Sequence, residues 1–115
     1  MKVVLDASPL ISLAVIGQLE LLPKLFTEII IPQAVSQEIS AAIYKKDAVK
    51  IAAFIKNWVH PAEQENNSSL NLGKGESEAI ALCRELKADL LIIDDKKARM
   101  AAESLEIKCI VLSVC

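Results

Sequence analysis

Acidic residues stand at the points of the chain where a metal site could form. Asp6 directly follows the apolar residues 3–5, and Asp94-Asp95 directly follow residues 88–93, which are aliphatic apart from Asp89. Glu38 and Glu76 lie near the starts of two helical patterns. Carboxylate oxygens suit hard cations such as Mg²⁺ and Mn²⁺. A cation held in this way activates water and neutralises phosphate charge, so the favoured chemistry is metal-assisted phosphodiester hydrolysis.

Each acid taken alone also has an ordinary structural interpretation. Asp6 could cap a helix or complete a turn, and Glu76 suits the positive end of a helix dipole. Glu38 could lie on a solvated helix face. The Asp94-Asp95 pair is more informative, because adjacent acids at the end of an apolar strand repel each other. If Asp94 caps the next helix, Asp95 is free to face the site.

Alternating strands and helices are predicted to position these acids. The apolar patterns predict strands at 2–5, 28–31, 88–93 and 107–112, an extended segment at 58–61, and helices at 9–16, 19–25, 34–42, 47–56, 76–86 and 96–105. Ser8 would cap the first helix, with Pro9 at its first position. Residues 63–75 read as a loop. This order predicts an α/β fold with a mainly parallel sheet, whose carboxyl edge collects Asp6, Glu38, Glu76 and Asp95.

The composition limits the class of protein. The chain has 115 residues, 53% hydrophobic and 3% aromatic, which predicts one domain over 1–115 with an aliphatic core. A formal net charge of −2 counts against a simple nucleic-acid-binding module, although an enzyme can meet phosphate through a metal. The three cysteines lack metal or disulfide spacing, and no signal or membrane span is evident. These features predict a cytoplasmic protein without membrane contact.

Other catalytic arrangements have little support. His60 is the only histidine, and no His/Cys set offers a zinc site. The segment Gly73-Lys74-Gly75 is too short for a P-loop and has no strand before it. A carboxylate-metal phosphatase would normally carry Asp-x-Asp, whereas residues 6–8 read Asp-Ala-Ser.

Four segments, in order, resemble the PIN-domain family over nearly the whole chain. They are Val-Val-Leu-Asp6-Ala-Ser8-Pro-Leu-Ile, Ile-Pro32-Gln-Ala-Val-Ser-Gln-Glu38-Ile, Leu-Gly-Lys-Gly75-Glu76-Ser-Glu-Ala-Ile-Ala and Leu-Leu-Ile-Ile-Asp94-Asp95-Lys-Lys-Ala-Arg99. The sequence is most similar to the VapC-like toxin branch. The resemblance implies a PIN-like three-layer α/β/α fold.

The resemblance also implies an Mg²⁺- or Mn²⁺-dependent endoribonuclease, the toxin of a toxin–antitoxin pair. Its partners would be RNA, an antitoxin protein and a second copy of the chain in a homodimer. Asp6, Glu38, Glu76 and Asp95 would be the catalytic metal-binding acids, with Asp94 the alternative to its neighbour. Ser8 would orient Asp6 or a water on the metal. Arg99 would pair with an acid or a substrate phosphate, or remain a solvated helix cation.

One departure from the family pattern concerns the C-terminal end. PIN domains usually continue past a strand such as 107–112 with a further helix and often a strand, which this sequence does not show. This departure keeps open a second interpretation, in which the chain is a weakly active or inactive PIN-like module that binds a partner or a second copy.

Overall fold

Five parallel strands form the central sheet of the computed structural model, which describes residues 1–42, 45–61 and 72–111. The strands are β1 (Lys2–Leu5), β2 (Glu28–Pro32), β3 (Val59–His60), β4 (Leu90–Ile92) and β5 (Cys109–Ile110), in the order β3-β2-β1-β4-β5. The first strand is therefore central: Val4 is in register with Ile30 on one side and with Leu91 on the other. The predicted α/β fold with a mainly parallel sheet is confirmed.

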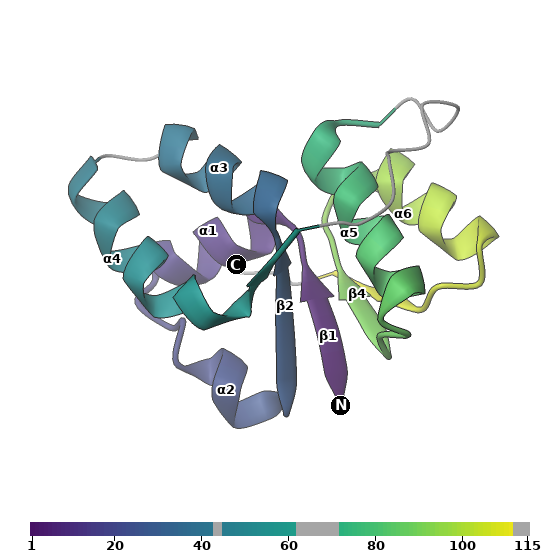
Figure 1. Cartoon of the computed structure of the whole chain (residues 1–115), viewed down its shortest axis with the longest axis horizontal. Coiled ribbons are helices and arrows are strands. Elements are labelled where there is room, and N and C mark those ends of the chain that lie inside the picture. The colour runs from purple at the N-terminus through teal and green to yellow at the C-terminus, as the bar shows by residue number, and fades with distance from the viewer. Residues whose placement is uncertain (43–44, 62–71, 112–115) are drawn as a thin grey trace.

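Helices cover both faces of this sheet (Figure 1). They are α1 (Ala7–Val15), α2 (Leu21–Leu25), α3 (Gln33–Ala42), α4 (Lys45–Ile55), the 3-10 turn η1 (Lys56–Trp58), α5 (Lys74–Glu85) and α6 (Lys96–Ser104). The helices α1 to α4 pack on one face, and α5 and α6 pack on the other. The result is the three-layer α/β/α arrangement implied by the sequence.

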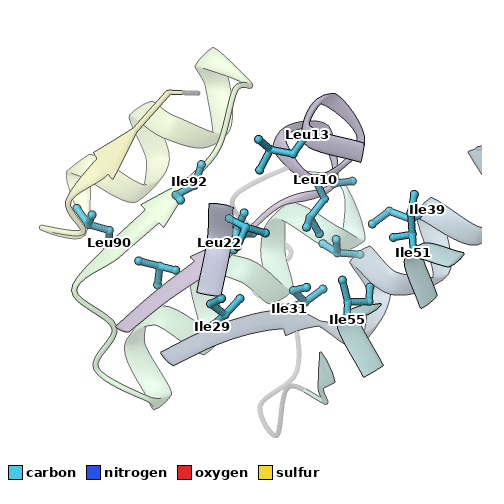
Figure 2. Close-up of a cluster of buried hydrophobic side chains, with 14 residues drawn as sticks. Leu10, Leu13, Leu22, Ile29, Ile31, Ile39, Ile51, Ile55, Leu90 and Ile92 are labelled. Atoms are coloured by element: carbon cyan, nitrogen blue, oxygen red, sulfur yellow. The ribbon is translucent and has the colours of Figure 1, made fainter. Parts of the chain in front are cut away.

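Successive side chains of a strand point to opposite faces of the sheet, so the core is divided into two clusters. Val3 and Leu5 point into the cluster under α1 to α4, whereas Val4 points into the cluster under α5 and α6. Figure 2 shows the first cluster, where aliphatic side chains from the helices meet those of the strands. A strand buried on both faces must be apolar throughout, which explains the near-continuous Val, Ile and Leu runs. The two packed faces hold the strand ends in fixed positions.

Several element boundaries differ from the predicted ones. The N-cap of α1 is Asp6 rather than Ser8, which lies inside the helix. The helix α5 begins at Lys74, two residues before the predicted start. The last two strands are shorter than predicted, as β4 and β5 show. Most of the predicted loop (62–71) and the end of the last predicted strand at Leu112 lie outside the described residues.

Candidate metal centre

The central position of β1 places Asp6 beside the end of β4. Leu5 is in register with Ile92, and the backbone N–H of Asp6 donates to the carbonyl of Ile92 at 3.1 Å. The Asp6 side chain is only 5% exposed. Because Asp94 and Asp95 follow β4 directly, the ends of two adjacent parallel strands bring three acids to one edge of the sheet.

Two helices bring the glutamates to the same edge. The helix α3 leaves the end of β2 and carries Glu38, and α5 begins near this edge with Glu76 in its first turn. The two helices are in direct contact, since the backbone N–H of Gly75 donates to Glu38 Oε1 at 3.1 Å. The carboxyl edge of the sheet therefore lies between the ends of helices from opposite layers (Figure 1).

The ionisation of Asp6 reflects this crowding of acids. The pKa of Asp6 is raised from 3.8 to about 6. Burial is the largest cause, and the charges of Glu38, Asp95 and Asp94 also raise this pKa, while the hydrogen bond from the backbone N–H of Ala7 lowers it. Four carboxylates thus share one electrostatic environment.

Glu76 belongs to the same environment. Burial is the largest cause of its raised pKa, followed by the charges of Asp6, Asp95 and Glu38. Lys97, in the first turn of α6, lowers the pKa of Glu76. The five acids named from the sequence lie near one another, and the positive charge of Lys97 acts on one of them, Glu76.

The acid pair after β4 is arranged differently from the expectation. Asp95, not Asp94, caps α6, because its Oδ2 accepts a hydrogen bond from the backbone N–H of Ala98 at 2.8 Å. The alternative considered from the sequence, in which Asp94 caps this helix, is therefore not the one that the structure shows. Asp94 is half-buried, and its Oδ1 is buried without a hydrogen-bond partner. A buried acceptor without a donor is costly in free energy, and a cation would satisfy it.

The chemistry of these donors fits Mg²⁺ or Mn²⁺. All donors are carboxylate oxygens, their charges repel, and one buried oxygen of Asp94 has no partner. As the side chains stand, however, no group of three or more His, Cys, Asp or Glu residues within the described ranges is arranged to hold a metal. Glu38 and Asp95 are each hydrogen-bonded to a backbone N–H instead. Metal binding would require these two side chains to turn or to use their second oxygens.

The two other residues named from the sequence have different surroundings. Ser8 lies in the first turn of α1, two residues after Asp6, and its side chain is exposed. Arg99 lies 3.8 Å from Glu103 one turn later, and its charge acts on Cys109 of β5. Arg99 does pair with an acid, but that acid is outside the cluster.

Three residues near the acids were not singled out from the sequence. They are Gly75, whose backbone N–H contacts Glu38, Glu78, whose Oε1 accepts from the backbone N–H of Ala34 at 3.1 Å, and Lys97. A glycine inside the first turn of a strong helical pattern is a usable sequence signal, because glycine there lowers helix stability. No local pattern indicates the other two.

The family comparison agrees with this fold and site. The sequence profile of the PIN domain matches residues 2–112, so the chain belongs to the PIN-domain family. PIN domains are generally nucleases and typically use divalent metal ions. No curated protein matches the chain. None of the described helices is long and apolar enough to cross a membrane.

Proposed function

We propose that this chain is a divalent-metal-dependent endoribonuclease of the VapC-like type, the toxin of a toxin–antitoxin pair. The observation that carries the proposal is the mutual electrostatic effect of Asp6, Glu38, Glu76 and the Asp94-Asp95 pair at one sheet edge. In a protein of the PIN family, such a group of acids suits Mg²⁺ or Mn²⁺, which supply activation of water and neutralisation of phosphate charge.

The residues of the chain have separate tasks in this proposal. Asp6 and Asp94 hold the cation from the strand ends, since the first is buried and the second has an oxygen without a partner. Glu38 and Glu76 complete the set from the helices. The chain neighbours of Asp6, Leu5 and Ala7, belong to the aliphatic core, so water is excluded on that side of the carboxylate. The lower local dielectric constant would strengthen the attraction between the carboxylate and a cation.

Cleavage of single-stranded RNA by the purified protein tests the proposed function. We expect cleavage when Mn²⁺ or Mg²⁺ is present and none with excess EDTA, because the metal supplies both the activated water and the neutralisation of phosphate charge. Single-stranded DNA of the same sequence is the matched control. Cleavage that persists in EDTA contradicts the metal mechanism. Binding of Mn²⁺ without any cleavage contradicts the nuclease assignment.

Lys97 is the proposed contact to the RNA backbone. The helix α6 begins with Lys96-Lys97, although a helix dipole disfavours cations in the first turn. A substrate phosphate in contact with Lys97 would offset this cost.

Lys97→Ala is expected to weaken RNA binding about equally for all sequences and to lower the salt dependence of binding by about one counterion. Arg99→Ala is the matched control, because the exposed pair of Arg99 with Glu103 contributes only about 0.3–0.5 kcal/mol. Fluorescence anisotropy of labelled RNA at several salt concentrations measures both. If Arg99→Ala lowers the salt dependence of RNA binding as much as Lys97→Ala does, the proposal that the substrate lies beside Lys97 is contradicted.

Exposed apolar side chains support the proposed homodimer or antitoxin contact. Val15 is 78% exposed at the end of α1, and Leu25 is 65% exposed at the end of α2. Exposed apolar side chains gain free energy when a partner buries them. A partner at either position would also suit the second candidate function, a PIN-like binding module with little activity. The engagement of Glu38 and Asp95 with backbone N–H groups favours that candidate.

A further inference from the structure

The helices α3 and α5 cap each other. Glu78 of α5 accepts a hydrogen bond at Oε1 from the backbone N–H of Ala34, in the first turn of α3, at 3.1 Å. Glu38 of α3 accepts one at Oε1 from the backbone N–H of Gly75, in the first turn of α5, also at 3.1 Å. The two bonds run in opposite directions and close a ring through residues 34–38 and 75–78. We call this ring the reciprocal cap.

The reciprocal cap supplies the N-terminal hydrogen-bond acceptors that the residues just before α3 and α5 cannot provide. The residue before α3 is Pro32 and the residue before α5 is Gly73, and neither side chain can accept a hydrogen bond. The first N–H groups of a helix need acceptors, and a carboxylate there also interacts favourably with the helix dipole. Each helix therefore obtains its N-terminal acceptor, with a favourable charge, from the other helix.

Gly75 is a position at which the backbone of α5 lies close to a side chain of α3. A Cβ atom at Gly75 would clash with the carboxylate of Glu38, with Oε1 as its nearest neighbour. Gly75 is buried, so the helix cannot move away from Glu38 without opening the contact. The glycine thus belongs to the reciprocal cap, although glycine inside a helix is unfavourable by itself.

We propose that Glu78 is a positioning residue for the metal centre, acting through the reciprocal cap. This inference rests on the proposed function, since two of the proposed ligands, Glu38 and Glu76, belong to the two segments that the ring joins. The hydrogen bond to Glu78 holds the first turn of α3 against the first turn of α5. Glu38 lies one turn further along α3, and Glu76 lies in the first turn of α5. The distance between the two glutamates is then set before a cation arrives, which lowers the entropy lost on binding.

Three variants test the positioning role, with the Mn²⁺ dissociation constant from calorimetry as the main measurement. Glu78→Ala removes the acceptor, and we expect it to weaken Mn²⁺ binding about tenfold, the lower end of the effect of losing an outer-shell partner. Glu78→Gln keeps an acceptor oxygen of the same reach, and it should remain within about threefold of the wild type. Ile80→Val removes a buried methylene from the same helix and lowers stability without touching the cap. It should bind Mn²⁺ like the wild type.

Amide hydrogen exchange gives a second measurement that needs no metal and no activity. Exchange of the Ala34 N–H should accelerate in Glu78→Ala more than in Ile80→Val, and it should stay slow in Glu78→Gln. Gly75→Ala serves as the second variant where Glu78→Ala does not fold. We expect it to weaken Mn²⁺ binding by a similar factor, because it displaces Glu38.

The outcomes separate this inference from the proposed function. Equal Mn²⁺ affinity in the wild type, Glu78→Ala and Gly75→Ala overturns the positioning role even if RNA is cleaved. An equal loss of affinity in Ile80→Val also overturns it, since the effect would then be one of stability. Tenfold weaker Mn²⁺ binding in Glu78→Ala, with recovery in Glu78→Gln, supports the role. That result would stand even if the wild type cleaved no RNA, which would contradict the nuclease assignment alone.

Discussion

Asp6→Asn is expected to lower metal-dependent RNA cleavage by at least about 100-fold, because a ligand contributes several kcal/mol of charge stabilisation at such a centre. Asparagine has nearly the same shape as aspartate, so the backbone bond from Asp6 to Ile92 should remain. Single-turnover cleavage of RNA by the two proteins at the same Mn²⁺ concentration measures the effect. Activity within about threefold of the wild type would show that Asp6 is not a ligand.

The same substitution should make the metal-free protein more stable at neutral pH. The pKa of Asp6 is raised from 3.8 to about 6 in the folded state, so protonation stabilises the fold. This contribution is fully present below about pH 4 and is lost as the pH rises through about 6. At pH 7 the charged, buried carboxylate therefore opposes folding by about 2–3 kcal/mol, from 1.36 kcal/mol for each unit of pKa.

Urea unfolding in EDTA checks this gain in stability. Asp6→Asn should exceed the wild type by about 2–3 kcal/mol at pH 7, and the difference should shrink toward zero near pH 4. Glu20→Gln is the control, since Glu20 is exposed beside α2 and away from the acids. A variant less stable than the wild type at pH 7 would contradict the electrostatic account of this site.

Asp94→Asn and Asp95→Asn should differ greatly in their effects. Asp94 has a buried oxygen without a donor, whereas Asp95 already accepts from the N–H of Ala98. We expect Asp94→Asn to weaken Mn²⁺ binding and cleavage by about 100-fold, as loss of a metal ligand does. Asp95→Asn should stay within about threefold, because asparagine is an equally good N-cap.

A third variant separates capping from metal binding at this pair. Asp95→Ala removes the cap of α6 and should lower the free energy of unfolding by about 1 kcal/mol, with little further change in Mn²⁺ affinity. Calorimetric Mn²⁺ titration and urea unfolding of the three proteins measure both quantities. If Asp95→Asn loses affinity and Asp94→Asn does not, Asp95 is the ligand and its capping bond must open on binding.

The sequence predicts the framework of this site well. Aliphatic runs that end at Asp6 and at Asp94 indicate buried parallel strands, and parallel strands place their carboxyl ends at one edge. The order of predicted strands and helices along the chain was therefore sufficient to predict that Asp6 and Asp95, almost 90 residues apart, would lie at the same edge of the sheet. The resemblance to the PIN-domain family, though not to its VapC-like branch, is confirmed by the match over residues 2–112.

The details that sequence could not provide depend on contacts between elements. The N-cap of α6 is Asp95 and not Asp94. The local backbone angles decide which of the two residues caps the helix, and two identical residues in a row do not reveal those angles. The start of α5 was placed too late, because glycines suggest a loop. Gly75 is instead helical, and its missing side chain admits Glu38 from another layer. No periodicity within one helix encodes such a contact.

The central place of β1 in the sheet also fixes when the site can form during synthesis. β1 is made first, but its partner on the other side is β4, and Leu5 pairs with Ile92. At about 5–20 residues per second, a ribosome needs roughly 4–17 s to pass from one to the other. Until then Asp6 lacks Asp94, Asp95 and Glu76. In a chain built in this order, the proposed set of acids is complete only after β4 and the two aspartates that follow it have been made.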